Sequence, residues 1–180
     1  MDKSIVEINC KSKNILQLWN WIYQLNKKKE NLHKKEVWLM NNLEFMNKFK
    51  PDTRCIKEFK FWIVCIRGKQ ATLGDAVILL KRQISSVGDM RPEEGAEFPE
   101  VIKWYEKVCT EKFGAVKFNY IIMMLKDYFV HYHAFPRYDK SINLFNKEWK
   151  DIDWPGAINF KDGEILDEEK LLEIKNYMCN

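Results

Sequence analysis

The stretch Phe129–Tyr138 reads FVHYHAFPRY, and the interpretation of the rest of the chain depends on it. It contains two of the three histidines of the protein, His131 and His133. Residues i and i+2 point to the same face of a β-strand, so the two imidazoles are expected to project together. Pro136 is expected to end this strand, because proline cannot donate a ladder hydrogen bond.

A convergent pair of imidazoles has several chemical uses. Imidazole titrates nearest to neutral pH, so the pair can serve as nucleophile, as general acid or base, or as metal ligands. The simpler interpretation is structural, with one histidine at the edge of the sheet and the other a satisfied polar group of the core. Spacing alone favours this structural interpretation.

A larger pattern in the chain resembles the histidine triad (HIT) superfamily. The family motif is His-φ-His-φ-His-φ-φ followed by Pro-Arg, where φ is apolar. Here Phe129 stands at the first triad position, and His131 and His133 hold the middle and last positions. The resemblance covers about half of the chain, and upstream landmarks follow in the family's order, namely FKFWIVCI, TLGDAVILLKRQ, DMRPEEGAEF and FNYIIMML.

The resemblance implies an α+β fold. An antiparallel β-sheet would pack against a long helix, with N-terminal helices and a short C-terminal helix added. The implied organisation is a helical extension over 1–55 packed on the core, a HIT-like module over 56–140, and a C-terminal extension over 141–180. Single-module relatives pair through the long helix and the sheet edge, so a homodimer is expected.

The resemblance also implies a chemistry. In the family the middle histidine attacks the α-phosphorus of a nucleotide, so His131 would form a covalent nucleotidyl-histidine that water or another acceptor resolves. A backbone carbonyl would fix its tautomer, and His133 would contact a phosphate oxygen or steady the other ring. The expected activity is that of a hydrolase or nucleotidyl transferase acting on dinucleoside polyphosphates or related nucleoside phosphate conjugates. No cofactor and no metal belong to this expectation.

Four further residues are candidates for nucleotide binding: Arg67, Asn119, Lys126 and Phe129. Relatives commonly carry Asp or Asn near the position of Arg67 to bind ribose, so an arginine would meet phosphate or a different sugar. Lys126 lies where many relatives have a Gly-Asn pair and is the possible substitute for it. Phe129 cannot make the hydrogen bonds of the missing first histidine.

These departures define an alternative function. The chain would then be a catalytically degenerate nucleotide-binding or protein-interaction module that kept the fold. The deciding feature is whether His131 faces an open, polar pocket or is walled in by Phe129 and Tyr128.

The composition limits the class of partner. With 180 residues and 46% hydrophobic content, the chain is long enough for one domain with a substantial core. A net charge of +4 from 30 basic and 26 acidic residues gives no strong case for nucleic acid or a membrane. An anionic small molecule fits equally well, and only the basic run at 27–35 hints at nucleic acid.

Cysteine usage and hydropathy indicate the compartment. The five cysteines are scattered without a Cys-x-x-Cys motif, which argues against a disulfide scaffold or a thiolate zinc site. No apolar run approaches the roughly 20 residues needed to span a bilayer, and the start lacks a signal-peptide core. A cytoplasmic protein is therefore expected.

Periodicity predicts the remaining elements. Proline and glycine should bound the long helix, with a kink or restart at Pro99, and the polar stretch 140–150 should be a loop. The expected helices cover 14–27, 36–49, 92–113 and 166–178, and the expected strands cover 59–66, 76–80 and 118–125.

Overall fold

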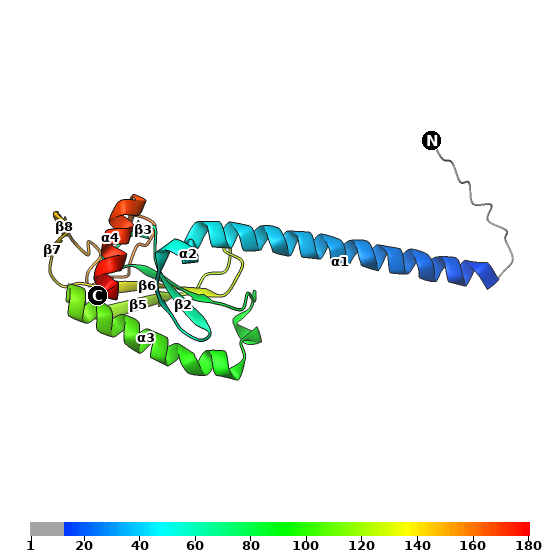
Figure 1. Ribbon diagram of the computed structural model, residues 1–180, viewed down its shortest axis with the longest axis horizontal. Coiled ribbons are helices and arrows are strands. Elements are labelled where there is room, and N and C mark those ends of the chain that lie inside the picture. The colour runs from blue at the N-terminus through cyan, green and yellow to red at the C-terminus, as the bar shows by residue number, and fades with distance from the viewer. Residues whose placement is uncertain (1–12) are drawn as a thin grey trace. The chain divides into compact units, whose positions relative to one another are not determined.

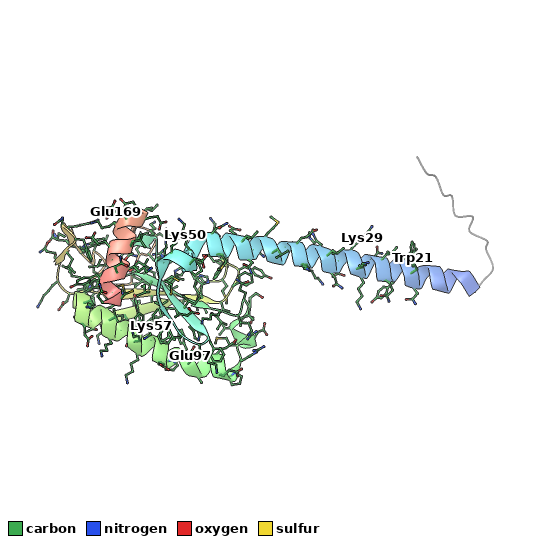
Figure 2. All side chains as sticks on the ribbon, viewed as in Figure 1. Trp21, Lys29, Lys50, Lys57, Glu97 and Glu169 are labelled. Atoms are coloured by element: carbon green, nitrogen blue, oxygen red, sulfur yellow. The ribbon has the colours of Figure 1, made fainter. Side chains whose placement is uncertain are left out.

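The computed structural model describes residues 13–180, without the side chains of residues 13–19 and Trp38. The chain divides into two units, the first ending at Asn41 and the second covering Asn42–Asn180. Figure 1 shows the helices and strands of the second unit. The first unit is helical, and Figure 2 shows Trp21 and Lys29 projecting outward from its helix. No helix among the described residues is both long and apolar enough to cross a membrane.

Helix α1 (Lys13–Phe49) is continuous, so the prediction of two helices separated by a basic stretch was wrong. The basic run KKKENLHKK consists largely of residues that tolerate helix well. Glu30 and Lys34, one turn apart within it, form an ion pair of 2.6 Å. The helix ends where Lys50 takes a left-handed conformation before Pro51, which opens the short helix α2 (Pro51–Arg54).

A five-stranded antiparallel sheet forms the body of the second unit, which confirms the predicted α+β class. Its strand order is β1-β2-β4-β6-β5. The strands are β1 (Cys55–Glu58), β2 (Trp62–Ile66), β4 (Ala76–Leu80), β6 (His131–Arg137) and β5 (Lys117–Ile121). Sequence periodicity missed β1 and started β2 too early, because residues 59–61 form the turn between these two strands. The Phe59 amide donates to the Trp62 carbonyl across it at 2.8 Å.

The centre of the sheet follows the predicted hairpin. Strand β2 pairs antiparallel with β4, which is buried along its whole length. Strand β4 pairs in turn with the histidine strand, so that Leu79 lies opposite His131 and Val77 opposite His133. This register places the histidines in the middle of the sheet.

Strand β6 continues through Pro136, so the expectation that this proline ends the strand was wrong. Pairing with β4 stops at Ala134, whereas pairing with β5 continues to Arg137. Pro136 therefore lies where β6 has a neighbour on one side only, a position that tolerates a missing amide. Strand β5 ends at Ile121, earlier than the predicted 125, and the residues that follow form an irregular segment.

Helix α3 (Pro92–Phe113) covers one face of the sheet. Proline opens it and Gly114, at a φ of 73°, ends it, as predicted. The helix is continuous across Pro99, so no restart occurs there. Its buried side chains Tyr105 and Cys109 join the main core formed with Trp62, Val64 and Ile78, among others.

The opposite face carries a second apolar cluster. Cys65, Val77 and Leu79 alternate with the main-core residues of β2 and β4, so they point the other way. The end of α1 covers them with two buried aromatic side chains, Phe45 and Phe49. The histidine side chains lie on this face.

The C-terminal part adds small elements around the sheet. Strands β7 (Ile142–Leu144) and β8 (Lys147–Trp149) form a hairpin where a loop was predicted. Its two-residue turn, Phe145-Asn146, has positive φ at both positions, as a type I′ turn requires. Helix α4 (Glu168–Cys179) confirms the predicted terminal helix. The remaining elements are β3 (Lys69–Gln70), which pairs with β9 (Glu164–Ile165), and the 3-10 turn η1 (Val87–Asp89).

Candidate functional site

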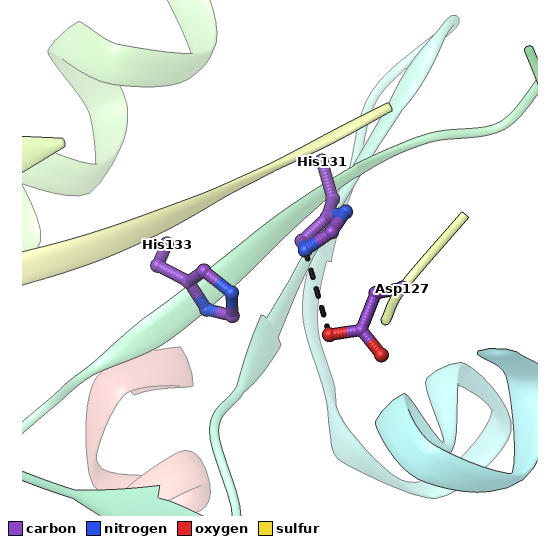
Figure 3. A group of neighbouring side chains, drawn as sticks. All are labelled: Asp127, His131 and His133. Carbon is purple, nitrogen blue, oxygen red and sulfur yellow. Dashed lines mark ion pairs between the residues drawn. The ribbon is translucent and has the colours of Figure 1, made fainter. Parts of the chain in front are cut away.

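His131 and His133 share one face of β6, as their spacing predicted. Their ring centroids lie 4.9 Å apart with the rings nearly perpendicular. Figure 3 shows the two imidazoles projecting toward the same space, with Asp127 beside His131. The alternation of side chains along a β-strand thus places the two imidazoles next to each other on one face of the sheet.

His131 has a defined tautomer. Its Nδ1 lies 2.6 Å from the backbone oxygen of Phe129, so Nδ1 carries the proton and donates it to that carbonyl. The lone pair therefore remains on Nε2, which lies 3.9 Å from Oδ2 of Asp127. Burial lowers the pKa of His131 and keeps the ring neutral, because the charged form loses its hydration.

His133 is also held neutral. Burial, and after it the nearby His131 and Arg67, lower its pKa from 6.5 to about 3. Its side chain is 7% exposed, and its Nδ1 has no hydrogen-bond partner among the described residues. Two neutral imidazoles with available lone pairs therefore lie side by side.

Aromatic side chains wall in His131, which is 0% exposed. The rings of Phe45 and Phe49, from the end of α1, lie 5.7 Å and 5.3 Å from its imidazole. Phe129 is buried in the same cluster, whereas Tyr128 is 47% exposed. The wall anticipated from Phe129 and Tyr128 is therefore built from Phe129 and the N-terminal helix.

Asp127 is the site residue that sequence reasoning missed. It lies on the irregular segment between β5 and β6, four residues before His131. Both of its carboxylate oxygens accept hydrogen bonds from Nζ of Lys48, at 2.6 Å and 2.5 Å. The sequence offers no signal for this contact beyond the presence of an acid near the histidines.

A cavity of about 680 Å³ opens beside this group, and His133 is the histidine that lines it. Its basic side chains come from four segments: Lys48, Arg54, Arg67, Lys69 and Lys126. Apolar side chains, including Phe49, Met123 and Leu166, supply much of the remaining wall. Several cations beside one carboxylate, Asp127, favour an anionic ligand with an apolar part.

The cations of the cavity differ in how they are engaged. Arg54 pairs with Glu168 at 2.5 Å, and Arg67 approaches the buried Asp75 at 3.5 Å. Lys126 is exposed and forms no ion pair with any residue that the structure describes. Lys126 is therefore the cavity cation that a ligand meets without displacing an internal partner.

The structure separates the predicted nucleotide-binding residues. Arg67 and Lys126 line the cavity with His133, whereas Asn119 and Phe129 are not among the lining residues. The side-chain oxygen of Asn119 accepts a hydrogen bond from Arg137, which also binds Asp151 through two nitrogens. The Pro-Arg end of the motif thus contributes a buried structural ion pair.

An antiparallel sheet with one long covering helix and paired histidines on a central strand defines the HIT class of fold. Comparison with solved structures shows the same fold. A histidine triad protein of Sinorhizobium meliloti superposes with a TM-score of 0.57 at 16% identity, covering 73% of this chain and 91% of that chain. The chain therefore has the HIT fold, as predicted.

Two other solved structures give similar values. A histidine triad protein of Marinobacter aquaeolei matches with a TM-score of 0.57 and 17% identity, over 73% of this chain and 90% of its own. A diadenosine triphosphate hydrolase of Plasmodium falciparum matches with a TM-score of 0.52 and 16% identity, over 71% of this chain and 74% of its own. The sequence matches no protein-family model and no curated protein.

Proposed function

We propose that the cavity beside His133 binds a nucleotide-type anion and that His131 attacks its phosphorus. The activity would be that of a hydrolase or nucleotidyl transferase acting on dinucleoside polyphosphates or related nucleoside phosphate conjugates. The hydrogen bond from Nδ1 of His131 to the Phe129 carbonyl carries this proposal. It leaves Nε2 as a neutral, oriented nucleophile next to a cation-lined cavity.

The proposed reaction has two steps. The Nε2 lone pair forms a bond to the α-phosphorus while the bond from phosphorus to the leaving oxygen breaks, and the leaving group departs as an anion. The oxygen of water or another acceptor then bonds to phosphorus while the P–N bond breaks, its electron pair returns to Nε2, and the acceptor's proton is released to solvent. Lys126 and Arg67 line the cavity and would offset the negative charge on the phosphate oxygens.

Access to His131 requires movement. Its imidazole has no exposed surface, and Phe49 belongs both to its wall and to the cavity lining. A substrate phosphate therefore reaches Nε2 only when the end of α1, or the segment that carries Asp127, shifts. The ion pair between Lys48 and Asp127 ties these two segments together.

The burial of His131 favours a second candidate function, a catalytically degenerate module that binds nucleotides or a protein partner. In that case the cavity would still take an anion through its cations, and the wall of Phe45, Phe49 and Phe129 would stay closed. The two candidates differ in whether a covalent bond to His131 forms.

Intact-protein mass spectrometry with a panel of adenosine and guanosine polyphosphates and phosphoramidates tests the proposal. The metal-free wild type is compared with His131→Ala, and with His33→Ala as the matched control, because His33 is exposed on α1. A nucleotide adduct or turnover lost only in His131→Ala supports catalysis. Binding that weakens in Lys126→Ala, without adduct or turnover, supports the degenerate module. Absence of binding, adduct and turnover rejects both.

We also propose that the protein is a homodimer and that α1 contributes to the contact. Leu18, Leu25, Leu32 and Leu39 recur at seven-residue steps, the spacing at which helices pair in coiled coils. The last three side chains are exposed within the described structure. A second copy of α1 would cover this leucine stripe.

Sedimentation velocity tests the dimer. The double variant Leu25→Lys/Leu32→Lys is expected to be monomeric, because two like charges enter the leucine stripe. Gln24→Lys/Asn31→Lys adds the same charges at exposed positions one residue away and is expected to remain dimeric. A monomeric wild type contradicts the dimer, and a dimer that survives both variants places the contact elsewhere.

A further inference from the structure

We propose that Asp127, His131 and His133 form a binding site for a divalent transition-metal ion. Each residue offers one ligand atom, and the three atoms lie within 4.8 Å of one another (Figure 3). Two of the three side chains come from β6, and the third reaches them from the segment that precedes this strand. The inference does not rest on the proposed function.

The unsatisfied Nε2 of His131, together with the convergence of three ligand atoms, carries the proposal. Nε2 of His131 and Nδ1 of His133 are buried and have no hydrogen-bond partner among the described residues. The residues themselves are 0% and 7% exposed. Burying a polar atom without a partner is unfavourable, and such atoms call for an explanation such as an ion. An ion held by Nε2 of His131, one ring nitrogen of His133 and the Asp127 carboxylate would satisfy the unpartnered nitrogen of His131.

The surroundings of His131 resemble those of a metal-binding imidazole. Its Nδ1 proton is held by the Phe129 carbonyl at 2.6 Å, which fixes the ring and directs the Nε2 lone pair toward Asp127. Ligating histidines typically donate their other nitrogen to a carbonyl or carboxylate in this way. The Phe129 carbonyl is therefore already positioned as the hydrogen-bond acceptor for a ligating His131.

The donor set selects the metal. Two imidazole nitrogens and one carboxylate oxygen suit Zn²⁺, Co²⁺, Ni²⁺ or Cu²⁺, whereas Mg²⁺ and Ca²⁺ prefer oxygen ligands. Three protein ligands leave a coordination position open, as in catalytic rather than structural zinc sites. Because His133 lines the cavity, this position would face it and accept water or an oxygen of an anionic ligand.

The ligand atoms must come slightly closer together to bind one ion. With metal–ligand bonds of about 2.1 Å, donors in a tetrahedral site lie roughly 3.5 Å apart. His131 Nε2 and Asp127 Oδ2 are now 3.9 Å apart. Asp127 lies on an irregular segment, whereas both histidines lie on a paired strand, so Asp127 is the ligand best able to shift once its contact with Lys48 is released.

Metal binding and the proposed attack on phosphorus would use the same lone pair on Nε2 of His131. A bound ion therefore blocks formation of a nucleotidyl-histidine, and a nucleotidylated protein does not take the ion through His131. Metal binding is measured without nucleotide, and covalent labelling is measured on metal-free protein, so each proposal fails or stands separately.

Titration of the metal-free full-length protein with Co²⁺, followed by visible absorption, tests the site. The wild type is expected to bind one ion with a d–d spectrum that Zn²⁺ abolishes by displacement. His131→Ala, His133→Ala and Asp127→Asn should each weaken binding by at least ~10-fold, whereas His33→Ala should not change it. Binding that is absent in the wild type, or equal in all variants, overturns the proposal, as does sulfur-to-cobalt charge-transfer absorption.

Lys48→Met provides a variant that does not remove a ligand. Lys48 competes for the Asp127 carboxylate and adds a positive charge beside the ion, so its removal should tighten Co²⁺ binding severalfold. Weaker binding in this variant would overturn the assignment of Asp127 as a ligand. Far-ultraviolet circular dichroism confirms that each variant is folded before the titration.

Discussion

The Nδ1 atom of His131 lies 2.6 Å from the backbone oxygen of Phe129, two residues earlier on the chain. This contact uses the main chain of a residue whose side chain differs from the HIT motif. Replacing histidine by phenylalanine at this position therefore leaves the carbonyl that orients His131 unchanged. The tautomer of His131 therefore follows from the backbone carbonyl of Phe129 and not from its side chain.

Nuclear magnetic resonance should show the tautomer of His131 and the protonation of both histidines directly. Long-range ¹H–¹⁵N correlation spectra are expected to report the Nδ1-protonated tautomer for His131. Burial lowers the pKa of both histidines, to about 3 for His133, so both rings should stay neutral well below the ordinary value of 6.5. An Nε2-protonated His131, or a His133 that titrates near pH 6.5, would contradict the geometry.

The lowered pKa of His133 predicts that the protein becomes less stable at acid pH. Between pH 6.5 and about 3 the unfolded chain binds a proton at His133 that the native protein does not bind. Stability is therefore expected to fall as the pH falls through this window. His133→Leu should flatten the pH dependence measured by chemical denaturation, and an unchanged slope would contradict the prediction.

Opening the aromatic wall should expose His131. Phe49→Ala removes a ring 5.3 Å from the imidazole and one side of the cavity, and it should cost about 3 kcal/mol of stability. Diethyl pyrocarbonate should then modify His131 faster, as measured by peptide mass spectrometry. Tyr23→Ala, at an exposed aromatic residue on the same helix, should change stability by less than ~0.5 kcal/mol and leave the rate unchanged.

Local patterns allowed the elements that carry the histidines to be predicted. Alternation placed His131 and His133 on one face, and Pro92 and Gly114 marked the ends of α3. These features depend on residues close in sequence, where strand alternation and the special backbone conformations of proline and glycine decide the structure.

Features that depend on distant contacts were not predictable. Phe45 and Phe49 lie one turn apart in the helix predicted over 36–49, and nothing local indicates that they cover a histidine some 80 residues later in the chain. Residues 59–61 read as the start of a strand because Phe59 and Phe61 are apolar. They form a turn instead, and the Phe59 ring packs against Trp104 on α3.

The site was only partly predictable for the same reason. Arg67 and Lys126 reach the cavity, but Asp127 could not be distinguished from other acids of the chain until its contact with Lys48 was seen. The cavity itself is built from segments that lie more than a hundred residues apart, such as Lys48 and Phe160.

The buried pair of Arg137 and Asp151 should be important for stability. Arg137 donates to the carboxylate through Nε at 2.6 Å and Nη2 at 3.1 Å, and both side chains are almost fully buried. Arg137→Ala leaves a buried charge without its partner and should cost about 3–5 kcal/mol. Lys150→Ala, which breaks an exposed pair with Glu148, should cost less than ~1 kcal/mol by denaturant unfolding.

The variant Arg137→Lys tests whether a positive charge at this position is enough without the two hydrogen bonds to Asp151. Lysine keeps the positive charge but cannot make the two-pronged contact, so this variant should also be less stable than the wild type. A lysine variant as stable as the wild type would show that charge alone suffices.

The first turn of α4 should make stability depend on pH in the acid range. Glu168 pairs with Arg54 at 2.5 Å and Lys50 at 2.6 Å, and hydrogen bonds from these two cations lower its pKa from 4.5 to about 2. Between these values the unfolded chain is protonated at this residue while the native protein is not. The stabilisation is therefore present above pH 4.5 and is lost as the pH falls toward 2.

Glu168→Gln should remove this dependence. Because Glu168 is about half exposed, solvent screens the pair, and the loss at neutral pH should stay below ~1 kcal/mol. Glu169→Gln is the matched control, since Glu169 is an exposed neighbour in the same turn that forms no ion pair with the described residues. Urea unfolding at pH 3 and pH 6 should show a smaller difference for Glu168→Gln than for the wild type or Glu169→Gln. Equal differences in all three proteins would mean that the contacts with Arg54 and Lys50 do not stabilise the fold.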